Sequence, residues 1–555
     1  IASLQESYED RGEGAELATE LANNALYYPL PIAERAPLVW GKPDESTYRA
    51  LLDALTPDNM LATFQAKGVP TDSIEEIYET AYAYTERTGD AYDRLVSPPA
   101  VDGFALPSAN PFIPKKTGLV TEQPLLIIND PTLQLYYAQD VEFERPQTTL
   151  KFRFVTSRAH ATAEMDLLLR FYDMCLGDAI EPAAGNASIA GVDYSLIIGL
   201  EGIVLTVSGF GDSPVRFAEY VAKQMLTFEV SEERFASLSE LVQRRLQSYA
   251  QTEAYSLARD RSSAVFRETY FLPDHSLDEA ARVTLADVKN AARDFMSAGK
   301  IETLVHGHIS PTAARKVARN IKRILRPSVV AEADLLKRRH ITIAPGDSVT
   351  DSAAIEGVNS TYRAVYRLPD ETPASRAAAS VIGNFIRTPF YEELRTKQQL
   401  GYIVGSGDGA SLRERVILFV IQSSEYSADE QRSRAETFIQ SLPAALAELP
   451  VDDWQTLIEG VRSQLEEKPK SIAEKADKFF ALGYDFSGEW SRTQEVLTAL
   501  DQLNQAGVAQ YLADTIDPKK SRAFITLLSS SNHDASSAET DFDDRKSWKA
   551  KQSYR

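Results

Sequence analysis

The spacing of apolar positions changes along the chain, and the changes recur in the same order in two long segments. Apolar and polar residues alternate over residues 149–157 and again over 360–368, which predicts two β-strands. Each strand leads into a helical period, near residues 161–180 and 372–398. The same order at both places indicates an internal repeat.

A second strand and a second helix extend this correspondence. Residues 202–213 and 415–427 alternate and then end in turn-forming residues, "GIVLTVSGFGDS" and "RVILFVIQSSEYS". A helix is predicted after each, and the next helices along the chain begin behind a capping residue with acidic residues in the first turn. Their apolar positions fall at the same spacing: Phe235, Leu238, Val242 and Leu246 in one, and Trp454, Leu457, Val461 and Leu465 in the other.

We therefore predict an α+β fold of repeated domains, each an antiparallel sheet flanked by helices. The boundaries expected from the pattern are 148–333 and 334–555, with a polar, solvated tail from about residue 529. Before them, residues 1 to about 90 have helical spacing, and a proline-punctuated stretch follows. Short apolar runs broken by Pro and Asn-Asp-Pro over residues 118–147 indicate a linker.

Charge and composition narrow the class of function. The 555 residues carry a formal net charge of -21, which argues against nucleic acid as a partner because phosphate binding needs clustered Lys and Arg. We find no apolar run of eighteen residues, so we expect no membrane span. The one cysteine, Cys175, excludes an internal disulfide and lies in an apolar helical pattern that predicts packing. No signal peptide is visible, and the compartment stays open between periplasm and cytoplasm.

The histidines give no complete metal site. None lies in H-E-x-x-H or H-x-x-E-H, the spacings that place two imidazoles on one helix face. His160 and Glu164 are four residues apart without a second histidine, and a helix-start histidine is the plainer interpretation. His306 and His308 would share one face of a strand, a geometry that some metals accept, but we favour a strand that ends at Gly307. The glycine-rich "GSGDG" at 405–409 predicts a hairpin turn.

The stretch "FYEELRTKQQLGYIV", residues 390–404, places an arginine and a tyrosine across a predicted helix end. We expect Gly401 to terminate the helix, with Arg395 in its last turns and Tyr402 at the start of the next strand. Both side chains are hydrogen-bond donors at neutral pH, suited to holding a carbonyl or a developing oxyanion. The alternative is a surface arginine beside a half-buried strand tyrosine.

These residues carry a resemblance. The segment "TPFYEELRTKQQLGYIVGSG" closely resembles the hallmark of the C-terminal half of insulin-degrading enzyme and pitrilysin, the inverted-zincin metallopeptidases. Other segments resemble their counterparts in order, from Tyr27 to about residue 528: "LYYPL", "LTPDNML", "LPSANPFIP", "LQLYYAQD", "FEVSEERF" and "EEKPKSIAEKADKFF".

The resemblance implies four homologous α+β domains in two halves that close around a chamber. Residues 1–117 would then be the closing part of the second domain, 118–147 the linker between halves, 148–333 the third domain and 334–555 the fourth. Zinc would be held by the N-terminal half, through its H-x-x-E-H motif and a downstream glutamate, and this chain would supply no metal ligand.

The resemblance also implies roles and partners. Tyr402 matches the family's oxyanion donor and, with Arg395, its substrate-binding pair. The partners would be the zinc-bearing N-terminal half and short peptide substrates, with no nucleic acid and no membrane. The expected function is the substrate-binding half of a zinc metalloendopeptidase, which alone would be inactive. A catalytically inactive member serving as a scaffold or assembly subunit is the alternative, and a peptidase specialised for one precursor also stays open.

Overall fold

The computed structural model describes most of the chain in two compact units, one up to Asn110 and one from Pro111 onward. The described residues are 14–34, 36, 44–77, 79–86, 89–96, 110–113, 125–273 and 277–555. No described helix is both long enough and apolar enough to cross a membrane.

The unit up to Asn110 is built of short helices and a small hairpin. Helices α2 (Gly14–Tyr27) and α3 (Glu45–Asp53) confirm the helical spacing expected there, and the others are η1 (Pro57–Asn59), β1 (Ser73–Ile74), β2 (Ala81–Tyr82) and α4 (Asp90–Val96). Asp44 caps α3 by accepting from the amides of Ser46 and Thr47. Hydrogen bonds from the Thr47 and Ser46 hydroxyls, with smaller contributions from the amides, lower the pKa of its carboxyl to about 2. The expected proline-rich connection lies largely outside the described residues.

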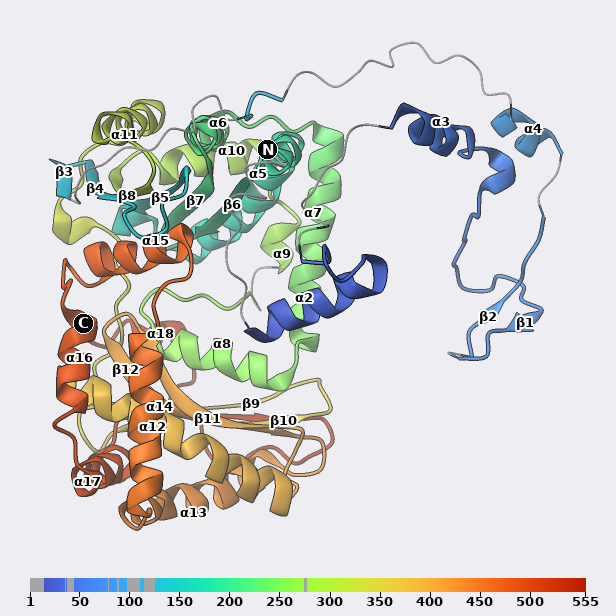
Figure 1. Ribbon diagram of the computed structural model, residues 1–555. Helices are drawn as coiled ribbons and strands as arrows, with labels where there is room; N and C mark the ends of the chain where they lie inside the picture. The colour runs from blue at the N-terminus through green and yellow to red at the C-terminus, as the bar shows by residue number, and fades with distance from the viewer. Residues whose placement is uncertain are drawn as a thin grey trace. The chain divides into compact units, whose positions relative to one another are not determined.

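The unit from Pro111 onward contains two sheets with matching strand orders (Figure 1). The first sheet has the order β3-β4-β8-β5-β7-β6 and the second, from its other edge, β9-β13-β10-β12-β11. In each sheet one pair is parallel, β4 with β8 and β9 with β13, and the remaining pairs are antiparallel. The strands are β3 (Leu125–Asp130), β4 (Leu133–Gln139), β5 (Gln147–Thr156), β6 (Val192–Gly199), β7 (Gly202–Phe210), β8 (Gly299–Gly307), β9 (Ser348–Ala354), β10 (Ser360–Arg367), β11 (Ile403–Ser411), β12 (Glu414–Ser423) and β13 (Ala523–Ser529).

The helices follow the same repeat. Those that lie between β5 and β9 in the chain are α5 (Ala163–Ile189), α6 (Ser213–Thr227), α7 (Glu232–Gln247), α8 (Ala254–Phe266), α9 (Leu277–Ala280), α10 (Leu285–Phe295) and α11 (Pro311–Leu325). The later ones are α12 (Pro373–Tyr391), α13 (Ala428–Ala447), α14 (Val451–Glu466), α15 (Ile472–Phe480), α16 (Arg492–Leu500), α17 (Gln505–Ile516) and α18 (Arg545–Lys549). The strand and helix pairs expected from the sequence are therefore present as β5 and β10, α5 and α12, β7 and β12, and α7 and α14.

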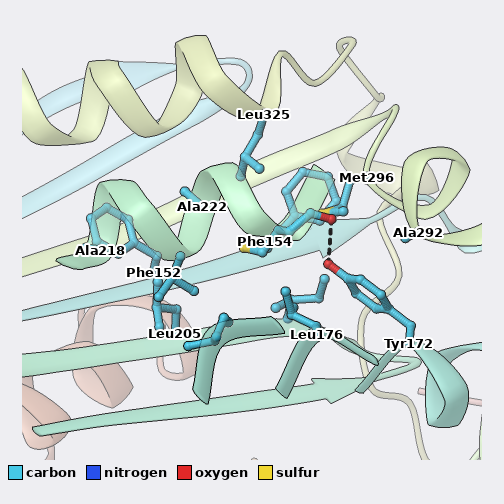
Figure 2. Close-up of a cluster of buried hydrophobic side chains, with 14 of the residues drawn as sticks. Phe152, Phe154, Tyr172, Leu176, Leu205, Ala218, Ala222, Ala292, Met296 and Leu325 are labelled. Atoms are coloured by element: carbon cyan, nitrogen blue, oxygen red, sulfur yellow. Dashed lines mark hydrogen bonds between the residues drawn. The ribbon is translucent and has the colours of Figure 1, made fainter. Parts of the chain in front are cut away.

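Each sheet buries one face against its own helices. Phe152 and Phe154 point from β5 into the first core, where they lie among side chains of α5, α6, α10 and α11 (Figure 2). Tyr172 is fully buried there and donates a hydrogen bond to the Met225 carbonyl at 2.7 Å, and burial raises the pKa of its phenol well above the usual range. Cys175 is buried in the same core, as the pattern predicted, and burial raises the pKa of its thiol to about 12.

The opposite face of each sheet is covered by a helix from the other half of the unit (Figure 1). Helix α8 packs on β13 and β10 of the second sheet, and α15 packs on β5 and β8 of the first. Because side chains alternate along a strand, Lys151 and Arg153 point away from the first core and pair with Asp477 and Asp485 beside α15. Each sheet is thus covered on one face by a helix from the half of the unit that contains the other sheet, and we call this the exchange of helices.

Two expectations about the ends of these domains were wrong. The expected linker, residues 118–147, contains β3 and β4, and β4 pairs with β8 far along the chain, so residues 125–139 are part of the first sheet. The expected solvated tail is also ordered: Tyr554 bridges to Ile341, and Phe542, Trp548 and Tyr554 pack on a small core under α8. Its polar composition reflects side chains that hydrogen-bond to the sheet, as Asp541 does with the amide of Thr350.

Candidate functional site

The candidate site lies where α12 passes into β11. After Tyr391 the helix widens into a π-helical segment, Glu392–Lys397, in which Leu394 is buried in the second core. Short π-helical insertions of this kind are frequent at functional sites because they shift side chains off the regular helical face. The insertion carries Arg395.

The joint between helix and strand is made differently from the expectation. The left-handed residue is Gln399, with φ of 53°, and not Gly401. Gly401 is required for another reason: a Cβ there would overlap the carbonyl oxygen of Gln422 on β12. Glycine thus lets the chain approach β12 closely just before Tyr402.

The structure brings Arg395 and Tyr402 together. The Arg395 guanidinium carbon lies 4.9 Å from the centroid of the Tyr402 ring and 5.0 Å from that of Tyr391. Among the described residues, no carboxylate forms an ion pair with this guanidinium, so aromatic faces hold it in place. Tyr402 is 78% exposed and Tyr391 is 41% exposed. The pair therefore presents two donors at the surface.

This arrangement can bind and polarise but cannot by itself attack a substrate. A guanidinium and a phenol donate hydrogen bonds to carbonyl or carboxylate oxygens, and neither is a nucleophile at neutral pH. The Arg395 guanidinium carbon lies over both rings, and a guanidinium carries five N–H groups with which to donate.

Tyr391 was missed by the sequence reasoning. Its signal was its position four residues before Arg395 in a helical pattern, the spacing at which two side chains meet on one helix face. The "GSGDG" expectation was wrong as well: residues 405–409 run inside β11, and the hairpin turn comes later, at Leu412, whose φ is 54°.

The histidines considered earlier occupy structural positions. His306 is fully buried, its Nδ1 lies 2.9 Å from the Ala138 carbonyl oxygen, and its ring meets the edge of Phe479. Strand β8 ends at Gly307, as favoured, and the φ of 118° there breaks the alternation that would have placed His308 beside His306. Burial lowers the pKa of both imidazoles. His160 lies in a short helical turn before α5, with Nδ1 3.6 Å from Asp294.

No zinc site is formed by the part of the chain that the structure describes. Its His, Cys, Asp and Glu side chains nowhere gather in a group of three or more that could hold a metal ion. Zinc needs three or four such ligands. These residues therefore do not fit a zinc centre on their own.

Comparisons with known proteins point in one direction. Residues 7–279 match the family described as the middle or third domain of peptidase M16, and residues 381–480 match the PQQ synthase PqqF-like C-terminal lobe domain 4. The A-factor-processing enzyme of Saccharomyces cerevisiae is 25% identical over 444 residues, which cover 78% of this chain and 43% of that protein. The insulin-degrading enzyme of Homo sapiens is 24% identical over 537 residues, covering 94% and 53%.

Solved structures agree on the fold. The pitrilysin crystal structure superposes with a TM-score of 0.80 at 18% identity and covers 100% of this chain and 60% of that one. A peptidase M16 inactive domain from Pseudomonas fluorescens superposes with a TM-score of 0.56 at 13% identity, covering 73% and 98%. The chain spans about half the length of the curated relatives it matches.

Proposed function

Because this chain belongs to the M16 family of insulinase-like peptidases, we propose that it is the substrate-binding, non-zinc half of a zinc metalloendopeptidase. The complete enzyme degrades short peptides in an enclosed chamber formed with a zinc-bearing N-terminal half. That half is either part of the same polypeptide or a separate chain.

The observation that carries this proposal is the stacked pair of Arg395 and Tyr402. Both donors are accessible, they adjoin one another, and both are fixed at a joint whose backbone is held by the second core. A surface arginine without such a function gains more from a carboxylate, as several exposed arginines among the described residues do.

Each residue has a distinct part in the proposed reaction. When bound in the other half, zinc supplies a water of lowered pKa and polarises the scissile carbonyl. Tyr402 donates its phenol hydrogen to the oxyanion that develops on that carbonyl. Arg395 donates from its guanidinium edge to a neighbouring backbone carbonyl and holds the peptide in place.

Tyr402→Phe tests this assignment in the complete two-half enzyme. Phenylalanine keeps the ring that stacks on Arg395 and removes only the O–H donor, so we expect kcat to fall by about 10²–10³ with little change in KM. Steady-state cleavage of a quenched fluorescent peptide measures both constants.

Tyr426→Phe is the matched control. Its ring lies 4.8 Å from the Arg434 guanidinium carbon and packs on the second core. This variant keeps wild-type turnover under the proposal. Wild-type turnover in Tyr402→Phe would remove Tyr402 from the chemistry.

A second candidate is an inactive member that serves as a scaffold. The observation that favours it is the likeness in fold to a structure described as an inactive M16 domain. A scaffold has no need of an exposed donor pair, so the scaffold predicts that neither tyrosine variant changes anything measurable in a peptide-cleavage assay.

A further inference from the structure

Strand β11 forms an open edge beside the Arg395 and Tyr402 pair. It is the outermost strand of the second sheet and pairs on one side only, with β12 along its whole length from Ile403 to Ser411. No strand described here pairs with its other side. An edge strand presents outward N–H and C=O groups in a row that another extended backbone can pair with.

The two faces of β11 differ in how crowded they are. Ser406 and Asp408 point toward α12: Ser406 donates to the Ile386 carbonyl at 3.1 Å, and a Cβ on Gly383 would overlap the Asp408 side chain. Because side chains alternate, the other face of β11 carries the glycines at positions 405, 407 and 409. Gly407 is buried and the Arg387 side chain lies against it, so a strand added at the edge would meet this arginine at the middle of that face.

A row of side chains on α12 runs along this edge. Arg387, Tyr391 and Arg395 follow one another at intervals of four residues, the spacing of one helix face, with the π-helical turn in the last interval. Nε of Arg387 lies 3.5 Å from the Cβ position of Gly407, in the middle of β11. Arg395 lies against Tyr402, at the start of β11.

The edge carries positive charge. Arg387 and Arg415 share the single carboxylate of Asp408, at 3.9 and 3.4 Å, so one positive charge there is not balanced by it. Arg395 adds a second, held by rings. A cationic edge on a chain of net charge -21 is complementary to an acidic ligand.

We propose that the open edge of β11 binds an extended peptide by strand addition and that Arg387 receives an acidic side chain of that peptide. Backbone pairing supplies affinity that does not depend on sequence, and the guanidinium supplies the preference for a carboxylate. The proposal deepens the proposed function, from which it takes peptides as the ligand class, but binding to the edge requires no turnover.

Backbone methylation of the peptide tests strand addition without altering the protein. The probe is a fluorescein-labelled ten-residue peptide of threonine, serine and valine with one central glutamate, and fluorescence anisotropy with the 555-residue chain gives Kd. Successive residues of an added strand point their amides to opposite sides. N-methylation of three alternate amides should therefore weaken binding at least tenfold in one of the two possible sets and less than twofold in the other.

A double-mutant cycle tests the role of Arg387. Arg387→Gln should raise Kd about three- to tenfold for the glutamate peptide and leave Kd for the matching glutamine peptide unchanged. Arg244→Gln on α7 is the control, since that arginine is exposed to a similar extent and lies on the first half of the unit. It should change neither constant.

Several results would overturn the proposal. Absent binding, equal sensitivity to both methylation sets, or equal effects of Arg387→Gln on the two peptides would each do so. A concentration-dependent dimer in sedimentation that the peptide does not dissociate would place a second copy on the edge instead. These outcomes are independent of Tyr402→Phe, which changes turnover and leaves the edge intact.

Discussion

At the residue scale, two aromatic rings hold the Arg395 side chain in place and leave it available to bind a ligand. An arginine in an ion pair donates its N–H groups to the carboxylate. Arg395 lies between the rings of Tyr391 and Tyr402 instead, and its N–H groups remain available to a ligand. A lysine could not replace it, because an ammonium has no planar face and no fork of donors.

His340 is the residue whose titration should be most visible in stability. It is buried, its Nε2 lies 2.8 Å from the Ser411 hydroxyl, and its ring lies against Phe266. Burial lowers the pKa of its imidazole to about 4, with nearby arginines adding to the effect against the opposing charge of Glu414. The native state therefore holds this histidine neutral at pH values where the unfolded chain is protonated.

The free energy of unfolding should consequently fall as pH decreases from about 6.5 to about 4, and this contribution should level off below that. Above pH 6.5 both states are neutral at this site and it adds no pH dependence. The loss is on the order of 3 kcal/mol. Urea unfolding at a series of pH values measures it.

His340→Gln is the comparison, because glutamine can still meet Ser411 but does not titrate. Between pH 6.5 and 4.5 most carboxylates do not titrate. In this range the free energy of unfolding of the variant should change less steeply with pH than that of the wild type, by a slope equivalent to about one proton. An unchanged slope would show that groups other than His340 cause the pH dependence of the free energy of unfolding.

Part of the candidate site could be predicted from the sequence. Arg395 and Tyr402 could be chosen from the sequence because both lie in one motif, but their stacking depends on the π-helical turn, which no local pattern signalled. Gly401 was selected for the wrong reason: its need comes from β12, a strand that follows it in the chain and contacts it only after folding.

At the element scale, one buried carboxylate joins three elements that are distant in sequence. Asp351 on β9 is 1% exposed and accepts from Arg261 of α8 at 2.5 and 3.0 Å and from Arg545 of α18 at 3.2 Å. It therefore fastens both the exchanged helix and the C-terminal segment to the second sheet.

Asp351→Asn should lower the free energy of unfolding by about 3–5 kcal/mol, because it leaves two half-buried arginines without their shared charge. Urea unfolding gives the value, and limited proteolysis should cut first in the C-terminal segment. Glu240→Gln, in an exposed pair with Arg244 on α7, is the control and should cost at most about 1 kcal/mol. Equal losses in the two variants would mean that Asp351 does not join these elements.

The elements found from sequence were those with long, regular patterns. Strands β5, β7, β10 and β12 and the helices after them have clear periods, and all were predicted. Strands β3 and β4 were not predicted, because their sequence consists of short apolar runs interrupted by proline and asparagine. The position of β4 is specified by its parallel pairing with β8, which the local sequence does not show. The C-terminal segment was missed because three aromatics, Phe542, Trp548 and Tyr554, anchor an otherwise polar stretch.

At the scale of the whole unit from Pro111 onward, the exchange of helices couples the two sheets. Helix α8 leaves the first half to pack on the second sheet, and α15 does the reverse, with Tyr484 donating to the Thr303 carbonyl at 2.7 Å just beyond it. Loss of α8 would expose apolar side chains of the second sheet, among them Val365 and Phe524. Loss of α15 would remove the ion-pair partner of Lys151 on the first sheet. The repeat was predictable from sequence, but this exchange was not, because periodicity does not say which sheet a helix covers.

The two sheets should therefore unfold in one transition. Thiol labelling of Cys175 reports on the first sheet. Fluorescence of Trp454 and Trp548 reports on the second, after replacement of Trp40 and of Trp490, which packs on Tyr136 of the first sheet, by phenylalanine. Coincident midpoints in urea are expected. Midpoints separated by more than the error would show that the halves are independent.

The central claim is that this chain completes a zinc centre held by another half. The measurement that tests it most directly is cleavage of a quenched fluorescent peptide of about ten residues, with zinc supplied, by this chain alone and then with the zinc-bearing half added. We predict no cleavage by the chain alone, and cleavage by the mixture at a rate well above that of the added half alone. Cleavage by the chain alone, or a mixture no more active than the added half by itself although the two associate, would contradict the claim.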